Sequence, residues 1–328
     1  MAGEPAASDG HRTESALAPM TSFRVSLSAY DRSPAELLEL AQAAESSGFH
    51  GLWLGEHALH VPGYASSHPQ HAGGTAIERP VVTEATRLPD QWVMIGAIAA
   101  STTRLHLGTA VHLLALRHPL HTARSVASIQ ILSGGRFSLG VGVGWLREEF
   151  DAFGIDFKRR GQIVEESVDV VRRVSTGDLV SHDGEFFRFG PAAIGLTAAP
   201  VSVLLGGNTE RALERAARIG DGWISSGTTG IDDVVRLRRR LRELRDRAGR
   251  AVEPFEVHAC VSDDAVTNVE RLRDAGFADI TVRSEFVWRG DSLSERSTGL
   301  ADFAAAIGLD PSPAAPCRTT STLAGSAS

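Results

Sequence analysis

The chain of 328 residues contains one lysine, Lys158, beside 32 arginines, and only two cysteines, Cys260 and Cys317. A lone lysine in a polar, basic stretch excludes a P-loop NTPase and leaves almost no room for Schiff-base chemistry. Two cysteines cannot form a disulfide framework, and neither of them is placed like a metal ligand. Chemistry that depends on lysine or on thiols is therefore not expected.

The chain also has no excess of positive charge and no long apolar run. The net charge is −7, from 33 basic and 40 acidic residues, so no broad positive field is available for nucleic acid or anionic lipid. The apolar stretch Trp92–Ala100 ends at Ser101, far short of the roughly 18 to 20 residues that span a bilayer. Residues 1–21 lack the basic start and apolar core of a secretory signal. We expect a cytoplasmic protein that binds neither nucleic acid nor membrane.

Glycine, by contrast, is abundant, with 33 copies, and it often separates a helical pattern from an apolar run. Ser33 to Glu36 combine an N-cap serine, a first-turn proline and a capping-box glutamate, which predicts the start of a helix. Gly48 is the expected end of that helix, before the strand-like run Gly51–Gly55. This strand, helix, strand punctuation recurs along the chain and is typical of α/β folds.

Eight apolar runs are candidate strands, and helical patterns separate nearly all of them: Phe23–Ser28, Gly51–Gly55, Leu105–Val111, Phe137–Val143, Val201–Leu205, Gly222–Ser225, Phe255–Val261 and Asp279–Val282. Eight alternating units predict one (β/α)8 TIM barrel over residues 22–310, with an open doubly wound sheet as the alternative.

Insertions are expected after strand 2, at Pro62–Pro89, and after strand 4, where a helix at about Gly161–Val174 precedes a hairpin turn at Asp183-Gly184. We interpret residues 1–21 and 311–328 as disordered tails.

Active sites of such barrels form at the carboxyl ends of the strands. Glu56 and His57 follow the second strand, and a carboxylate beside an imidazole is typical of a proton-handling pair, although a loop hydrogen bond is the alternative. His60, His68 and His71 lie nearby and suggest a metal site. The segment has no cysteine and has the glycine and proline content of a loop, so we predict no metal.

Two glycine-rich turns also follow strands. Gly140, Gly142 and Gly144 alternate, but Trp145 stands where a dinucleotide fingerprint needs glycine. Such glycines remove side chains where a planar ligand or another backbone approaches, and packing alone is the alternative. Residues 206–209 open a helical stripe, and amides at a helix N-terminus can bind a phosphate, whereas an ordinary N-cap at Asn208 or Thr209 would need no ligand. Whether Trp145 and Trp223 belong to the core or face a ligand stays open.

Taken in order, these motifs resemble the bacterial luciferase-like superfamily of flavin and deazaflavin oxidoreductases, and they are most similar to members that use coenzyme F420. The resemblance spans about Phe23–Ile307 and is carried by residues 53–57, 107–111, 132–145 and 148–150, by Arg160-Gly161, and by Gly206-Gly207 with Asp221-Gly222-Trp223.

The resemblance implies a barrel with the cofactor ring at its carboxyl mouth, a non-proline cis peptide at Ala110–Val111 behind the ring, and the cofactor phosphate on the second glycine turn. His57 would protonate the substrate, or stabilise charge on it, during hydride transfer, with Glu56 orienting or tuning His57. The expected cofactor-binding residues are Gly108, Thr109, Ala110, Val111, Gly142, Gly144, Trp145, Gly206, Gly207, Asn208 and Thr209.

The same resemblance leaves alternatives open. A reduced-FMN monooxygenase, served by a separate flavin or F420 reductase, would use the same barrel mouth, and a catalytically silent relative would keep the barrel without its chemistry. Sugar-phosphate dehydrogenases of the superfamily carry a glutamate where this chain has Trp145, and an Asp-His pair where it has Glu56-His57. A larger or more apolar small organic substrate is therefore expected.

The superfamily commonly forms homodimers through helices near strands two and three. In this chain, such a packing surface includes Met94 and Ile98 unless both face the barrel.

Overall fold

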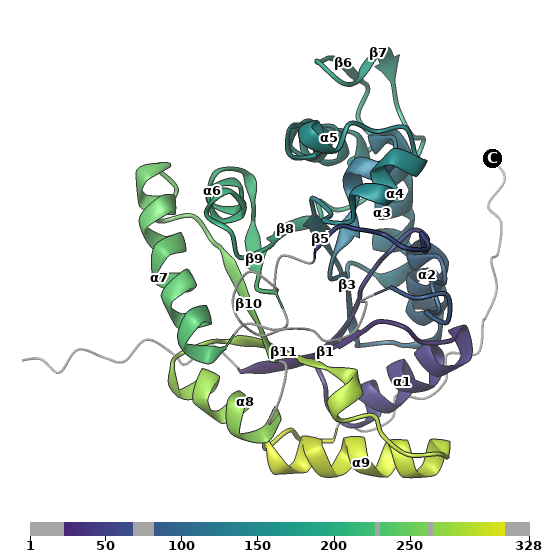
Figure 1. The fold of residues 1–328 in the computed structure, drawn as a ribbon, viewed down its shortest axis with the longest axis vertical. Helices are drawn as coiled ribbons and strands as arrows, with labels where there is room; N and C mark the ends of the chain where they lie inside the picture. The colour runs from purple at the N-terminus through teal and green to yellow at the C-terminus, as the bar shows by residue number, and fades with distance from the viewer. Residues whose placement is uncertain (1–22, 68–81, 227–229, 262–264, 312–328) are drawn as a thin grey trace, which may run out of the picture.

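The computed structural model describes residues 23–67, 82–226, 230–261 and 265–311, in which strands alternate with helices (Figure 1). The strands are β1 (Arg24–Ala29), β2 (Gly51–Leu54), β3 (His106–Thr109), β4 (His112–Leu113), β5 (Phe137–Gly142), β6 (Val180–Asp183), β7 (Arg188–Ala192), β8 (Ser202–Gly206), β9 (Gly222–Ile224), β10 (Glu256–Val261) and β11 (Asp279–Arg283). The α-helices are α1 (Pro34–Ser46), α2 (Gln91–Ser101), α3 (Pro119–Ser133), α4 (Arg147–Ala152), α5 (Arg160–Ser175), α6 (Glu210–Ile219), α7 (Ile231–Arg247), α8 (Ala265–Asp274) and α9 (Leu293–Ala306). Apart from Pro311, the predicted tails lie outside the described residues.

The parallel strands close into a barrel. Neighbouring strands pair in the order β3-β2-β1-β11-β10-β9-β8-β5, and β3 pairs back with β5 through Leu107 opposite Phe137. β4 continues the path of β3 beyond Ala110 and Val111 and also pairs with β5. Each of the eight apolar runs supplies one barrel strand, so the predicted (β/α)8 barrel is confirmed. The closing β3–β5 pair excludes the open sheet, because an open sheet would leave both edges unpaired.

The first helix begins and ends as its sequence signals predict. Ser33 caps α1 by accepting a hydrogen bond from the Glu36 N–H, and the Glu36 side chain accepts one from the Ser33 N–H. Such a cap contributes about 1 kcal/mol to helix stability. Gly48 adopts a φ of +85° just after the helix, a conformation that favours glycine, and the next residues enter β2.

The predicted insertion after the fourth barrel strand contains α4, α5 and an antiparallel hairpin of β6 and β7, which lies beside α5 at the top of Figure 1. Asp183 pairs with Arg188, so the connection has four residues and starts immediately after Asp183. The Glu166 carboxylate on α5 accepts hydrogen bonds from the Phe186 and Phe187 N–H groups. These bonds attach the hairpin to α5.

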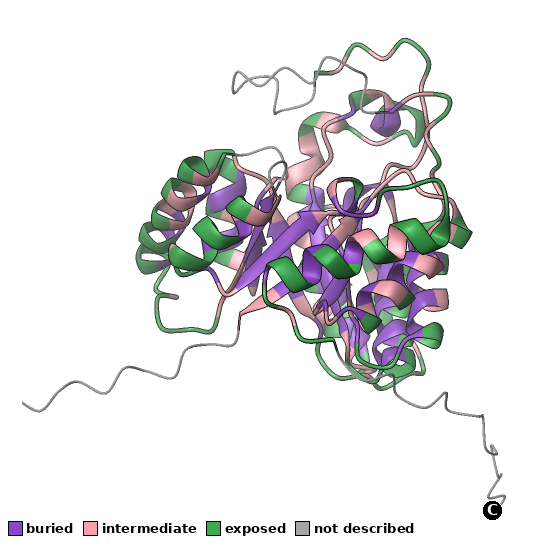
Figure 2. Cartoon of the chain, turned by 90° about the horizontal axis from the view of Figure 1, so that it is seen from below, coloured by how far each residue is buried: buried purple, intermediate pink, exposed green. Residues whose placement is uncertain are grey.

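Buried side chains fill the barrel and the layer between strands and helices, whereas the outer helix faces are exposed (Figure 2). Met94 and Ile98 on α2 are 4% and 1% exposed, so they face the strands and do not form a packing surface for a second chain. The basic helix α7 turns its buried Leu241 and Leu244 inward, in keeping with an outer barrel helix. Within the described parts of the chain, no helix is both long and apolar enough to cross a membrane.

Candidate active site

His57 lies at the carboxyl end of the barrel, three residues after β2, and contacts a buried carboxylate. Its Nδ1 is 2.9 Å from Oε2 of Glu149 in α4. Oε1 of Glu149 accepts hydrogen bonds from the N–H groups of Ala58 at 2.6 Å and Leu59 at 3.3 Å. When ionised, this carboxylate can only accept hydrogen bonds, and Nδ1 of His57 then carries the proton of the contact. Nε2 is then the ring nitrogen that remains to exchange a proton.

Glu149 belongs to the segment 148–150 that carries the resemblance, but it was not among the expected catalytic residues, and the predicted pairing of His57 with Glu56 is wrong. Neighbouring residues of an extended chain point to opposite sides, so the two side chains diverge where β2 ends. Glu149 is fully buried and the His57 side chain is 8% exposed. The sequence signal for Glu149 was its place just beyond the glycine-rich strand. Only the folded structure distinguishes it from the adjacent Glu148, because it buries Glu149 and leaves Glu148 partly exposed.

Glu56 contacts a different set of residues, which lie on β4 and shortly after it. Its oxygens accept hydrogen bonds from the Leu113 N–H at 2.8 Å and from Arg117 at 2.5 Å, and lie 3.1 Å from Nδ1 of His112. Burial opposes ionisation of this carboxylate, but His112, Arg117 and the Leu113 N–H outweigh burial and lower the pKa of Glu56 to about 2. Glu56 is therefore a charged anchor for the segment that contains β4.

His112 extends this anchor to the neighbouring elements. Its Nδ1 also lies 2.9 Å from Oε1 of Gln91, and the Gln91 amide donates to the Leu54 carbonyl at 2.7 Å. The network thus connects the end of β2, the start of α2 and β4. It holds the chain immediately after the Ala110–Val111 peptide bond, which is cis as the resemblance implied.

Three aromatic rings extend from His57 across the mouth. Tyr30 packs edge-on against the His57 ring with centroids 5.9 Å apart, and Trp145 contacts it at 5.4 Å. Tyr64 packs against Trp145 at 5.8 Å. Trp145 is partly exposed beside His57, whereas Trp223 is a fully buried core residue whose Nε1 donates to the Gly207 carbonyl at 2.8 Å. The two tryptophans therefore have different roles, which the sequence left open.

The glycines that were expected to make room for a planar ligand or another backbone make room for protein atoms. A Cβ atom on Gly140 would meet the Thr109 carbonyl oxygen, and the others would meet side chains. A Cβ atom on Gly108 would lie 2.1 Å from Trp53, and one on Gly144 would lie 2.6 Å from Phe150. Cβ atoms on Gly142 and Gly206 would lie 2.2 and 2.7 Å from the two methyl groups of Val111. Packing thus explains the missing side chains, and a ligand would meet these residues only through their backbone.

Thr109 is also occupied within the protein. Its hydroxyl is fully buried and donates to the Gly140 carbonyl at 2.7 Å. Only its two successors in the chain, Ala110 and Val111, are partly exposed. Of the predicted residues on this strand, these two present side chains at the barrel mouth.

The second glycine turn lies where β8 meets α6. Gly207 has a φ of +113°, a conformation that favours glycine, and Thr209 caps α6 by accepting from the Ala212 N–H at 3.3 Å. Asn208 accepts from the Ser226 N–H at 3.0 Å, which links the turn to the segment after β9. The structure therefore brings residues 206–209 to the carboxyl end of the barrel, with the partially positive end of α6 beside them.

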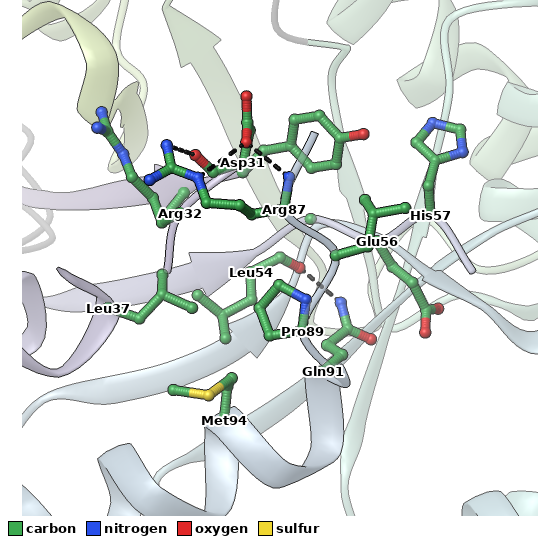
Figure 3. Close-up of a pocket in the computed structure, with 14 residues that line it drawn as sticks. Asp31, Arg32, Leu37, Leu54, Glu56, His57, Arg87, Pro89, Gln91 and Met94 are labelled. Atoms are coloured by element: carbon green, nitrogen blue, oxygen red, sulfur yellow. Dashed lines mark hydrogen bonds and ion pairs between the residues drawn. The ribbon is translucent and has the colours of Figure 1, made fainter. Parts of the chain in front are cut away.

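A small cleft, partly open to solvent, lies between the ends of β1 and β2 (Figure 3). His57 lies at one end of it and Arg32 at the other, and Asp31 accepts hydrogen bonds from the backbone and side chain of Arg87 between them. Among the described residues, no cluster of histidine, cysteine and carboxylate side chains is arranged to hold a metal ion. His68 and His71 lie outside that part of the chain.

Comparisons with known proteins assign a family to this architecture. The family described as luciferase-like monooxygenase matches residues 15–297. An F420-dependent glucose-6-phosphate dehydrogenase of Nakamurella multipartita is 31% identical over 244 residues, which cover 73% of this chain and 66% of the relative.

Solved structures confirm the fold. An F420-dependent secondary alcohol dehydrogenase in complex with an F420-acetone adduct superposes with a TM-score of 0.69 at 16% identity, covering 87% of this chain and 99% of the other. The oxygenating constituent of 3,6-diketocamphane monooxygenase from Pseudomonas putida, in complex with FMN, has a TM-score of 0.56 at 19% identity, covering 73% and 67%. At these identities the likeness concerns the barrel alone.

Proposed function

Because the chain belongs to the luciferase-like monooxygenase family, we propose that it is an oxidoreductase that uses coenzyme F420 to transfer a hydride to or from a small organic substrate. His57 exchanges the accompanying proton with the substrate or stabilises charge on it. The 2.9 Å contact between His57 and the buried Glu149 at the barrel mouth carries this proposal. The similarity to an F420-dependent dehydrogenase supports the choice of cofactor.

The barrel mouth has a surface suited to a flat ring. Ala110 and Val111 are partly exposed, although Thr109 and His112 on either side of them are fully buried. The side chain of Val111 packs against Gly142 and Gly206, and these contacts fix its position. When bound, F420 supplies the ring carbon that gains or loses the hydride. We assign Ala110 and Val111 to the face that supports the ring.

The turn at residues 206–209 suits the cofactor phosphate. Thr209 begins a helix of ten residues, α6, whose N-terminus favours an anion. The bond from Ser226 to Asn208 and the bond from Trp223 to the Gly207 carbonyl hold the turn in place before any ligand binds. A preformed turn reduces the entropic cost of binding.

Glu149 gives His57 a defined role in proton exchange. The carboxylate holds the proton on Nδ1 and fixes the ring between Tyr30 and Trp145. Nε2 is then the atom that takes a proton from the substrate or returns one.

Binding of F420 and FMN, each oxidised and reduced, to the purified full-length protein tests the cofactor assignment. We expect F420 to bind at least about tenfold more tightly than FMN, as measured by fluorescence quenching. Equal or preferential binding of FMN would contradict the assignment.

With a substrate found by screening alcohols and carbonyl compounds, His57→Ala should lower kcat by about 100-fold or more and leave F420 affinity nearly unchanged. His121→Ala, an exposed change on α3, is the matched control. Full turnover by His57→Ala would remove His57 from the mechanism.

A reduced-FMN monooxygenase is the second candidate, supported by the FMN-bound neighbour with the same barrel. Turnover distinguishes this candidate from the F420-dependent one, since a monooxygenase would consume oxygen and require reduced FMN from a separate reductase. Failure of both cofactors to bind would favour a silent relative.

The substrate is proposed to be less polar than a sugar phosphate. Trp145 stands against His57, where a polar hydroxyl-rich substrate would lose hydrogen bonds. The activity named for the Nakamurella relative is therefore not carried over. Pairing of two barrels into a homodimer stays a prediction.

A further inference from the structure

Tyr30 places a buried hydroxyl group without a hydrogen-bond partner beside His57. The residue directly follows β1, and its ring is inclined 68° to the His57 ring. No described residue accepts from or donates to its Oη, which is buried. Buried hydroxyl groups nearly always have a partner, because leaving one unpaired is unfavourable. The orphaned Oη therefore needs an explanation outside the described protein groups.

The phenol is suited to donate. Burial, together with the negative charges of Asp31 and Glu149, raises the pKa of Tyr30 above its ordinary value. At neutral pH the group therefore keeps its proton, and the partner that it lacks is an acceptor.

The surroundings of Tyr30 specify what kind of molecule could bring that acceptor. Tyr30 and His57 line the same cleft, with Ala29, Leu37, Leu54 and Met94 among the other lining residues. The charged side chains that line it are already engaged, Asp31 with Arg87 and Glu56 with Arg117. Arg32 also has a buried, unpartnered Nε, but Figure 3 shows it at the end of the cleft far from His57. Near His57 the apolar surface comes from the rings of Tyr30 and Trp145, and the nearby Glu56 is already paired, so this region suits an uncharged acceptor on an apolar body.

We propose that Tyr30 donates a hydrogen bond to the substrate, and that the substrate is a small, mostly apolar molecule with a carbonyl or hydroxyl oxygen at the position facing His57. This assignment rests on the proposed function in one respect, that the cleft beside His57 receives the substrate. Tyr30 selects the oxygen and His57 exchanges the proton. A hydrocarbon of the same shape would leave Oη unpaired and so bind more weakly.

The chain offers a direct test, because Tyr30 and Tyr64 are its only tyrosines. Full-length protein carrying ¹³C at the tyrosine Cζ should give two signals, which Tyr64→Phe assigns. Cyclohexanone is the probe, and methylenecyclohexane, which has the same shape without the oxygen, is its control. We expect cyclohexanone to shift the Tyr30 signal and methylenecyclohexane to shift it much less.

Tyr30→Phe completes the test. It should weaken cyclohexanone binding about tenfold in ligand-observed NMR, and it should not lower Tm, because the hydroxyl makes no bond to any residue that the structure describes. An unmoved Tyr30 signal, equal affinity of wild type and Tyr30→Phe, or a lowered Tm of the variant would each overturn the proposal. If cyclohexanone shifts Tyr30 while neither F420 nor FMN binds, this inference stands and the proposed function falls.

Discussion

His57 and Glu149 are 92 positions apart in the sequence, and the fold brings them together across the mouth of the barrel. His57 reaches this place because it follows β2, and Glu149 because α4 follows the glycine-rich β5. The imidazole was recognisable as a candidate from its residue type and its position after a strand. Its carboxylate partner was not, because two glutamates stand side by side and only the tertiary structure buries one of them.

Replacing Glu149 tests whether it positions His57. Glu149→Gln keeps the size of the side chain but removes the charge that fixes the proton on Nδ1, so we expect kcat to fall by about 10- to 100-fold. Cofactor affinity and KM should change much less, because neither depends on the direction of the imidazole proton. Steady-state kinetics with the substrate found by screening would measure both.

The adjacent Glu148 provides a matched control. Its carboxylate accepts from the Ala65 and Ser66 N–H groups and does not contact His57, so Glu148→Gln should keep kcat within about twofold of wild type. Equal kcat values for both variants would show that Glu149 has no part in positioning His57.

At the scale of elements, β3 and β4 form one barrel strand that is interrupted at Ala110 and Val111. Glu56, from the end of β2, holds the second part through Leu113 and Arg117. The sequence indicated a single run over Leu105–Val111, and neither the separate β4 nor its anchor was foreseen. Strand propensity concerns local conformation, whereas this interruption depends on Val111 packing over Gly142 and Gly206.

Glu56→Gln should destabilise the protein by about 2 to 4 kcal/mol at neutral pH, since it leaves Arg117 and His112 without their negative partner. The pKa of Glu56 is about 2 in the folded protein, below its ordinary value of 4.5, so its ionic contribution is complete above about pH 5. That contribution is lost as the pH falls toward 2, because the carboxylate is then protonated in both states. The difference between wild type and variant in urea unfolding should therefore shrink below pH 4.5.

Glu285→Gln is the control, because its pair with Arg283 is about half exposed and such pairs contribute less than about 1 kcal/mol. A difference between wild type and Glu56→Gln that stayed constant from pH 7 to pH 3 would contradict the ionic account.

At the scale of the whole molecule, the two ends of the barrel differ. The carboxyl end carries the candidate site, and the opposite end contains a partly buried pair of histidines at the starts of strands. His50 stacks on His106 with ring centroids 5.4 Å apart, and His106 Nε2 lies 2.9 Å from the Ser138 hydroxyl. Burial and the nearby His50 lower the pKa of His106 to about 4. In barrels of this kind, residues at this end serve stability.

Acid should therefore destabilise the molecule before its carboxylates are protonated. The unfolded chain binds a proton at His106 near its ordinary pKa of 6.5, and the folded protein binds it near pH 4. Stability should fall as the pH drops through this interval, by up to about 1.4 kcal/mol per pH unit from this residue. His106→Gln, which does not titrate, should reduce that slope in denaturant unfolding between pH 6.5 and 4. The exposed His121→Gln should leave the slope unchanged, and equal slopes for the two variants would contradict this origin.

The sequence by itself determined the barrel, because the information for it is local. Apolar runs, the capping box at Ser33 and the glycine after α1 each depend on neighbours a few positions away, and eight such units leave few ways to bury their apolar faces. His57 was also accessible from sequence, since parallel strands bring their carboxyl ends to one side. Only the tertiary structure decided that Glu149 and not Glu56 contacts His57, that the glycines accommodate Trp53, Val111 and Phe150, and that the hydroxyl of Tyr30 has no partner among the described residues. These features depend on side-chain direction and on contacts between distant segments, which periodicity and motif spacing do not specify.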